Sequence, residues 1–371
     1  MSAAEADAII HRRLEPYRIG VIKPILMEWN QFAFDEAYER GIINRPVKLI
    51  PREVMGSPIR DSADVIDAFY DLAENERVLG IIGMWDTDNA LACLPHIEKV
   101  GVPTFSMCGS QQYVGQWAFN ISNGGMADEP AVVSSWLQQK GYRRIGLLKE
   151  PTQIGEEYTN YLRRETRDRG MRIEAEATVD VVSTPEQMKA AFASLKQAGV
   201  DAVAYFGLGT NCGLLRAALE SVVWDPPRIM GTAFVGAPFS REAALAMDGW
   251  VGVDQYHEEN RVFQAVLDRF EKKFGVREGN SIASASYDIA HALAIALGRM
   301  RTASPAGLRD ALETVRRVPA CTGAPGTVIT FGPHDRRGLH GPDFLILRRA
   351  VNGTTVLEGT APVEPWPHPA R

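Results

Sequence analysis

The feature of this sequence that most constrains its fold is a repeated alternation of short β-branched runs with longer segments of helical periodicity. Residues 18–24 (RIGVIKP), 47–51 (VKLIP) and 78–84 (VLGIIGM) are typical of buried strands. Between the last two, apolar residues recur at three- and four-residue steps over residues 59–73, as they do on one face of a helix. Such alternation is the pattern of parallel strands joined by crossover helices. The sequence therefore predicts an α/β fold with parallel sheets.

A second round of the same alternation begins after a loop at residues 120–129. A helix is expected at 130–140 and a strand at 143–149, and the pattern continues to a strand at 228–234. A chain of 371 residues also exceeds what one hydrophobic core usually serves. We therefore expect an N-terminal lobe of residues 18–122 and 256–322, a C-terminal lobe of residues 123–255 and 323–371, and an N-terminal extension at residues 1–17, with hinge crossings near 120–125, 252–257 and 320–326.

The composition narrows the classes of partner. The formal net charge is -6 and the basic residues are scattered among acidic ones, so no surface for nucleic acid is expected. No apolar stretch approaches the roughly 18 residues that a membrane-spanning helix needs. The first residues lack the basic and apolar segments of a secretory signal, which favours the cytoplasm. The alternative is a periplasmic protein whose signal has been removed.

The cysteines give no sign of a disulfide framework. Cys93, Cys108, Cys212 and Cys321 lie far apart, without the paired spacing of a disulfide or zinc motif. We therefore expect reduced thiols and no metal site.

In open parallel sheets, ligands bind outside the carboxyl ends of the strands, where loops and helix N-termini leave polar backbone groups unpaired. Two such sheets that face each other across a cleft would bury most of a small ligand. The loops of interest are those that follow Pro24, Met84, Met107, Lys149, Gly207, Phe234 and Val253.

Four segments of the sequence, in this order, resemble the type I periplasmic-binding fold, in the branch of ABC-transporter receptors for branched-chain amino acids and amides. They are VLGIIGMWDTDNALACLPHIEKVGVPTFSMCGS, FNISNGGMADEPAVVSSWLQQKGYRRIGLLKE, SASYDIAHALAIALGRM and GAPGTVITFGPHDRRG. The resemblance extends from about residue 18 to about residue 358. It implies two Rossmann-like lobes with parallel sheets, an interdomain cleft that closes around a small molecule, no chemical step and no cofactor.

The resemblance also assigns roles to two loops. In the family, the loops after the third and fourth strands hold the ligand's carboxylate or amide with hydroxyl groups and backbone N–H groups. Thr87 and Ser110 stand where the family has such hydroxyl residues. Trp85 and Asp86 replace smaller neutral residues, which adds an aromatic wall and an acceptor that an anionic ligand end would not favour.

The sequence departs from the family where the ligand's ammonium group would bind. Amino-acid receptors of the family place an acidic residue in the loop after the strand that matches 228–234, but residues 232–236 read TAFVG. An α-amino acid ligand is therefore not expected. Aromatic residues on the predicted cleft loops instead suggest an apolar or flat ligand with one polar end near Thr87 and Ser110. The residues expected to face the ligand are Trp29, Trp85, Asp86, Thr87, Cys108, Gly109, Ser110, Ser122, Asn123, Ile154, Phe206, Phe234, Asp254 and Tyr256.

Two further segments match the motifs of known sites only in part. The glycines of residues 207–213 are spaced G-x-G-x-x-x-G rather than as in a dinucleotide fingerprint, and the next strand ends without the acid that holds a ribose. Residues 86–88 begin like a calcium loop, but Ala90 and Leu91 stand where a ligand oxygen and a glycine are needed. An enzyme that uses Cys108 as nucleophile, with His257 as base, is the alternative function.

The implied partners depend on where the protein acts. A periplasmic receptor would deliver its small-molecule ligand to the permease of an ABC transporter. A cytoplasmic relative, similar to the amide sensor of the amidase operon, would pass ligand occupancy to a regulatory protein. A homodimer is left open.

Overall fold

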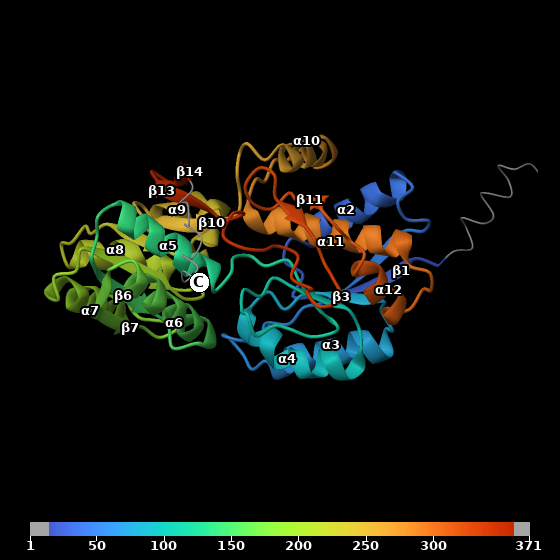
Figure 1. Cartoon of the computed structure of the whole chain (residues 1–371), viewed down its shortest axis with the longest axis horizontal. Helices are drawn as coiled ribbons and strands as arrows, with labels where there is room; N and C mark the ends of the chain where they lie inside the picture. Colours follow the sequence, from blue (N-terminus) through green and yellow to red (C-terminus); the bar gives the residue numbers. More distant parts are fainter. Residues whose placement is uncertain (1–14, 360–371) are drawn as a thin grey trace, which may run out of the picture.

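The computed structural model describes residues 15–359, which form two lobes, each built around its own sheet (Figure 1). The lobe that contains the earlier strands, here the N lobe, has a five-stranded, entirely parallel sheet with the strand order β2-β1-β3-β4-β5. Its strands are β1 (Tyr17–Ile22), β2 (Val47–Arg52), β3 (Gly80–Ile82), β4 (Thr104–Ser106) and β5 (Ala118–Asn120).

The other lobe, here the C lobe, has a seven-stranded sheet with the order β14-β13-β10-β9-β8-β6-β7. Its strands are parallel except for β13 and β14, which pair antiparallel at one edge. The predicted α/β class with two lobes and mainly parallel sheets is confirmed. The strands are β6 (Arg144–Lys149), β7 (Arg172–Thr178), β8 (Ala202–Phe206), β9 (Arg228–Met230), β10 (Val251–Asp254), β13 (Ile346–Val351) and β14 (Thr354–Gly359).

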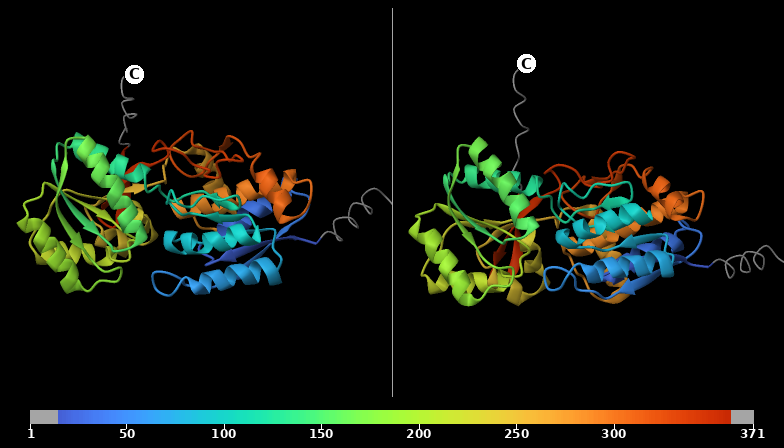
Figure 2. Two further views of the ribbon diagram at one scale, coloured as in Figure 1. Left: turned by 60° about the horizontal axis from the view of Figure 1, so that its bottom comes forward. Right: turned by 90° about the horizontal axis from the view of Figure 1, so that it is seen from below.

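Helices cover both faces of each sheet (Figure 2). In the N lobe, α3 and α4 lie on one face and α2 and α11 on the other. The N-lobe helices are α2 (Met27–Glu39), α3 (Ala63–Tyr70), α4 (Thr87–Val100), α10 (Arg261–Phe274), α11 (Ser281–Arg299) and α12 (Pro305–Leu312). The C-lobe helices are α5 (Asp128–Gln139), α6 (Gln153–Asp168), α7 (Pro185–Gln197), α8 (Leu215–Ser221) and α9 (Arg241–Ala246).

The chain crosses between the lobes for the third time further along the sequence than predicted. A short ribbon of β11 (Val318–Pro319) and β12 (Val328–Ile329) is followed by Phe331, which packs edge-on against Phe105 of the N-lobe sheet. Gly338 then donates its N–H to the carbonyl of Asn120. The segment up to Gly338 therefore still belongs to the N lobe, and the third crossing lies between Gly338 and β13 rather than near 320–326.

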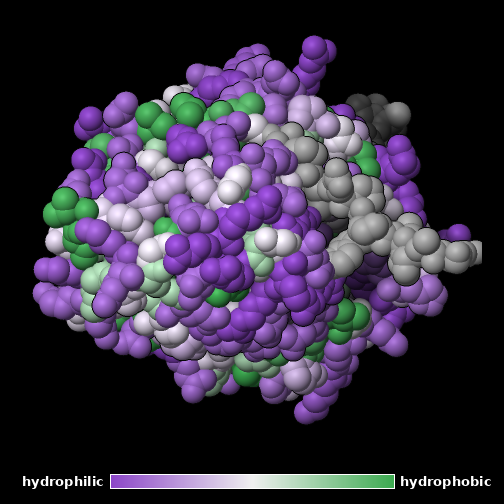
Figure 3. All heavy atoms as spheres, turned by 60° about the vertical axis from the view of Figure 1, so that its left-hand side comes forward, coloured by the Kyte–Doolittle hydropathy of each residue, from purple (hydrophilic) through white to green (hydrophobic). Residues whose placement is uncertain are grey.

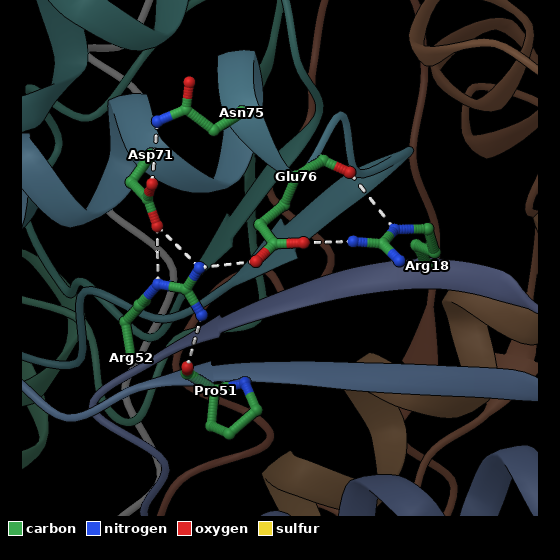
Figure 4. Close-up of polar contacts among 6 residues, drawn as sticks. All are labelled: Arg18, Pro51, Arg52, Asp71, Asn75 and Glu76. Atoms are coloured by element: carbon green, nitrogen blue, oxygen red, sulfur yellow. Dashed lines mark hydrogen bonds and ion pairs between the residues drawn. The ribbon is translucent and has the colours of Figure 1, made fainter.

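An ion-pair cluster ties the outer part of the N lobe together (Figure 4). The Arg52 guanidinium bridges Asp71, at 2.6 Å, and Glu76, at 2.8 Å, and Glu76 also pairs with Arg18. Asn75 donates a further hydrogen bond to Asp71. Carboxylates of the same lobe compensate the charges of both arginines. The cluster also joins the π-helical turn after α3 to β1 and β2.

The surface shows one further property of the fold. The outer face of the C lobe is mainly hydrophilic, with hydrophobic side chains in small, separate groups (Figure 3).

Within residues 15–359, no helix combines the length and the apolar character required to cross a membrane. Most of the expected N-terminal extension lies outside the described residues.

Candidate functional site

A cavity of about 270 Å³ lies between the lobes, at the carboxyl ends of strands from both sheets. Its walls follow β3 and β4 in the N lobe and β8 and β9 in the C lobe. The position agrees with the rule that ligands bind beyond the carboxyl ends of parallel strands. The cavity is lined by Ile25, Trp85, Asp86, Thr87, Met107, Gly109 and Ile282 of the N lobe and by Asn123, Met126, Ile154, Tyr158, Gly207, Leu208, Thr232, Ala233, Val235 and Phe239 on the C-lobe side.

The N-lobe wall is built on the first turn of α4. Asp86 is the extended residue before the helix, and Thr87 is its buried first residue. The Asp86 carboxylate accepts a hydrogen bond from the Lys23 ammonium at 2.7 Å, so its charge is compensated. The Trp85 indole N–H donates to the Lys23 carbonyl at 2.7 Å, which fixes the ring at the cavity. This wall therefore presents an ion-paired carboxylate, an aromatic ring and the N-terminus of a helix to the cavity.

Ser110, the second expected hydroxyl anchor, does not line the cavity. Its buried Oγ donates to Glu157 Oε2 at 2.6 Å, and the Gln111 N–H donates to Glu157 Oε1 at 3.0 Å. Glu157 lies on α6 of the C lobe, so these bonds join the two lobes directly. We call Ser110, Gln111 and Glu157 the interlobe clasp. The Ser110 hydroxyl proton is used by the clasp.

The C-lobe wall contains a buried acid that the sequence did not indicate. Glu129, in the first turn of α5, is fully buried behind two cavity residues, Tyr158 and Thr232. The Tyr158 hydroxyl donates to Glu129 Oε1 at 2.5 Å, and the Thr232 hydroxyl donates to the same oxygen. The backbone N–H of Thr232 donates to Oε2 at 2.6 Å, and that of Gly125 to Oε1 at 3.0 Å. Burial raises the pKa of Glu129 to about 7, although these four donors oppose the shift.

Two glycines make room for this carboxylate. A Cβ at Gly124 would stand 1.9 Å from Glu129 Oε1, and one at Gly231 would stand 2.7 Å from Oε2. Gly124 also has a φ of +91°, in the left-handed region that favours glycine. The backbone therefore surrounds Glu129 closely on both sides.

A second buried acid shapes the neighbouring loop. Glu150, directly after β6, accepts hydrogen bonds from the Tyr205 hydroxyl and from the Leu208 N–H, the latter at 2.8 Å. Burial raises its pKa. A Cβ at Gly207 would meet the Glu150 carboxyl carbon at 2.4 Å, so a glycine is required at this point of the cavity wall. The loop after β8 lines the cavity with Gly207 and Leu208.

The structure brings six of the fourteen expected ligand-facing residues to the cavity. They are Trp85, Asp86, Thr87, Gly109, Asn123 and Ile154. The other eight lie elsewhere: Trp29, Cys108, Ser110, Ser122, Phe206, Phe234, Asp254 and Tyr256.

The expected aromatic lining is mostly core. Because α2 begins at Met27, Trp29 falls in its first turn and stacks on Phe270 with 3.7 Å between ring centroids. Phe206 is fully buried and stacks on Tyr158 at 4.9 Å. The strand expected to continue to Phe234 ends at Met230, and a 3-10 helix (Thr232–Phe239) turns Phe234 into the core.

Residues expected at the second hinge crossing build that crossing instead of the cavity. Asp254 is buried 3.8 Å from Arg348, whose guanidinium also lies 5.1 Å above the Tyr256 ring. The carbonyl of Ser122 accepts a hydrogen bond from the Gln255 side chain at 3.1 Å. These contacts hold the crossing segments together at the base of the cleft.

The geometry gives no support to the enzyme alternative. Cys108 is fully buried, and burial raises its pKa to about 11, whereas a nucleophilic cysteine needs a lowered pKa. The Nδ1 atom of His257 accepts the Glu259 N–H at 3.0 Å. Among the described residues, no group of three or more His, Cys, Asp or Glu side chains could hold a metal ion.

Sequence reasoning missed the polar part of the C-lobe wall. Tyr158 lies one helical turn after Ile154 on α6, so the i to i+4 rule, applied to Ile154, would have found it. The sequence prediction for the loop with Thr232 depended on an acid within that loop. Glu129 reaches that loop from α5, 103 positions earlier in the sequence.

Solved structures share this fold. An ABC transporter substrate-binding protein from Desulfitobacterium hafniense in complex with Leu is 16% identical, covers 92% of this chain and 100% of its own, and has a TM-score of 0.76. A branched-chain amino acid transporter substrate-binding protein from Streptococcus pneumoniae in complex with isoleucine is 16% identical, with 92% and 98% covered and a TM-score of 0.76. A periplasmic binding protein type 1 from Bordetella pertussis is 18% identical, with 93% and 100% covered and a TM-score of 0.78. At these identities the likeness shows the fold.

A comparison at the level of families agrees with the structure. No curated protein matches the chain. The family model described as periplasmic binding protein matches residues 30–344, which is most of the chain. The resemblance inferred from the four sequence segments is confirmed. The chain belongs to the periplasmic binding protein family.

Proposed function

We propose that the protein binds a small solute between its lobes and delivers it unchanged to the permease of an ABC transporter. The observation that carries this proposal is the cavity itself, which takes its walls from the strand ends of both lobes. A ligand that contacts both walls stabilises the closed arrangement and shifts the population towards it. Similar solved structures are described as substrate-binding proteins of transporters, which supports delivery to a permease.

We propose further that the ligand has an apolar or aromatic body with one polar end. Trp85, Met107, Met126 and Leu208 give the cavity much of its apolar lining. The expectation against α-amino acids rested on a loop without an acid. Since Glu129 reaches that loop from α5, the argument from the missing acid no longer excludes an amino group.

The test is to incubate the protein with a library of amino acids, amides, amines, short peptides and aromatic acids. We expect isothermal titration calorimetry to detect binding of at least one compound. Mass spectrometry of that compound after its release should show an unchanged mass. Gly109→Leu should abolish binding, because a Cβ there makes only ordinary contacts, from 3.5 Å, while the longer side chain enters the cavity. Gly213→Leu is the matched control, since nothing lies within 4 Å of its Cβ and Gly213 does not line the cavity.

Chemical conversion of the bound compound, abolished by Cys108→Ala, would contradict the proposal. The cytoplasmic location, the regulatory partner and the homodimer stay predictions. Fractionation of the producing cells, pull-down with the purified protein and light scattering check them in turn.

A further inference from the structure

A second cavity, of about 330 Å³, lies outside the cleft, where the chain crosses between the lobes for the second time. It shares no lining residue with the cavity in the cleft. Its walls come from the start of α9 and from the β13–β14 hairpin, which pack against each other in the C lobe, and from the segment after β10, which leads into the N lobe (Figure 1). We call this cavity the hinge pocket. Its charged lining residues are Arg241, Glu258 and Arg348.

Arg348 has no donor left for a ligand. A guanidinium has five N–H groups, and all five of Arg348 are used. Two donate to the oxygens of Glu258, at 2.9 and 2.8 Å, and the others donate to Thr355 and to the carbonyl of Tyr256. The buried Asp254 lies behind it, 3.8 Å from Nε. The charge of Arg348 is therefore compensated, and so is that of Glu258, the acid in the pocket wall.

Arg241 is the cation that remains. Within residues 15–359, its side chain takes part in no hydrogen bond or ion pair. Its stem lies on the turn of the β13–β14 hairpin, because a Cβ at Gly353 would stand 2.8 Å from Arg241 Cγ and 3.3 Å from Nε. Gly353 has a φ of +82°, so a glycine suits both the turn and this close approach. The hairpin thus holds the side chain at the pocket and leaves its N–H groups unpaired.

Hydroxyl groups of the pocket also have protons to donate. The Thr355 hydroxyl accepts a hydrogen bond from Arg348 Nε at 3.3 Å, so its own proton stays available. The hydroxyls of Tyr256 and Thr354 form no hydrogen bond in the part of the chain that the structure describes. The Tyr256 hydroxyl is placed by the N lobe, since a Cβ at Gly279 would stand 2.8 Å from it. The pocket therefore combines one unpaired cation with hydroxyl donors.

We propose that the hinge pocket binds a tetrahedral oxyanion, either free or as the end group of an ester, with Arg241 as its cation. The guanidinium fork matches two oxygens of such an anion, and the hydroxyls of Tyr256, Thr354 and Thr355 are donors for the others. The bound anion joins α9 and the β13–β14 hairpin of the C lobe to the segment that enters the N lobe. This site is separate from the cleft and does not depend on the proposed solute binding.

The test is calorimetry of the full chain with inorganic phosphate, sulfate and glycerol 3-phosphate. Sodium chloride keeps the ionic strength constant, because salt screens exposed charges. We expect at least one of these anions to bind with a Kd of about 1 mM or tighter. Arg241→Gln should weaken that binding by about tenfold or more, since a hydrogen bond to a charged group contributes about this factor. Arg241→Lys should lose less, because it keeps the charge and loses only the fork.

Arg261→Gln is the matched control. Arg261 is also an exposed first residue of a helix that follows a capping side chain, and it has no partner among residues 15–359, but it does not line the hinge pocket. Its substitution should leave anion affinity within about twofold of wild type. Hydrogen exchange with the anion present should slow in residues 237–242 and 352–356 of the wild type and not in Arg241→Gln.

The outcomes decide between a built site and surface charge. If none of the three anions binds, if Arg241→Gln binds as tightly as wild type, or if Arg261→Gln loses as much affinity, the proposal is overturned. Tighter binding of glycerol 3-phosphate than of inorganic phosphate supports the proposal with an ester as the ligand, and the reverse order supports it with the free anion. Solute binding in the cleft stands in every case.

Discussion

Asp86 in the N-lobe wall and Glu129 behind the C-lobe wall are two acids held in opposite ways. In the N-lobe wall, the side chain of Asp86 is 21% exposed and pairs with Lys23. In the C-lobe wall, Glu129 is fully buried and depends on uncharged donors. A partly exposed ion pair contributes little to stability, whereas a buried carboxyl group without a cation is costly to ionise and is retained only in a closely fitted environment. The N-lobe wall is therefore expected to tolerate substitution of its acid, and the C-lobe wall is not.

The largest difference is expected when each acid is truncated. Glu129→Ala should lower the free energy of unfolding by roughly 3 kcal/mol, because the buried N–H groups of Gly125 and Thr232 lose their acceptor. Asp86→Ala should cost less than about 1 kcal/mol. Urea denaturation followed by circular dichroism measures both. Equal losses of stability in the two variants would contradict this difference between the walls.

Replacing a glycine by alanine should also destabilise the C-lobe wall more than the N-lobe wall. Gly124→Ala should cost about 2 kcal/mol, since its Cβ would overlap the Glu129 carboxylate and its φ of +91° strains any other residue. Gly109→Ala, where the Cβ finds its nearest neighbour at 3.5 Å, should stay within about 1 kcal/mol. Thermal melting of the two variants side by side tests this, and a more stable Gly124→Ala protein would refute it.

The C-lobe wall should also make the stability of the protein depend on pH, through the ionisation of Glu129. The pKa of Glu129 is raised by burial from an ordinary 4.5 to about 7, so the folded protein holds this proton more tightly than the unfolded chain. Its contribution to stability is complete below about pH 4.5 and is lost as the pH rises through about 7. Relative to Glu129→Gln, the wild type should therefore lose about 2 kcal/mol between pH 5 and pH 8, at about 1.4 kcal/mol per pKa unit.

The quantity to compare at each pH is the free energy of unfolding of the wild type minus that of Glu129→Gln. Other buried groups, such as Asp288, whose pKa burial raises to about 6, titrate in both and cancel. Chemical denaturation at intervals of half a pH unit gives the difference. A flat difference curve would show that Glu129 does not ionise in this range.

The smallest effect is expected at the paired acid. Lys23→Gln removes the ammonium from Asp86, but both side chains are partly exposed, so the loss should stay below about 1 kcal/mol and shrink in high salt. Denaturation at low and high salt measures it. A larger loss that salt does not reduce would mean that the N-lobe wall is as dependent on its charge pair as the C-lobe wall is on Glu129.

The sequence predicted one wall much better than the other. Trp85, Asp86 and Thr87 follow β3 directly, so the strand pattern and the carboxyl-end rule were enough to place them at the cleft. The polar centre of the C-lobe wall joins α5, α6 and the segment after β9, and Glu129 and Thr232 are 103 positions apart. No local periodicity contains such a contact, because it depends on how helices dock on the sheet.

Element ends explain the remaining misplacements. The alternation predicted the order of the lobes and their sheets, which is a property of whole segments. Trp29 and Phe234 were placed on loops because the start of α2 and the end of β9 were each misjudged by a few residues. A shift of that size turns a side chain from the cleft to the core.

The interlobe clasp has a consequence for the speed of binding. Glu157 joins Ser110 and Gln111 from one lobe to the other, so these bonds have to break when the lobes separate to admit a solute. Association is then gated by a conformational step, and the observed rate should approach a plateau as solute concentration rises. Glu157→Ala should raise that plateau in stopped-flow measurements. The clasp would thus set how quickly a solute is captured and how long it stays.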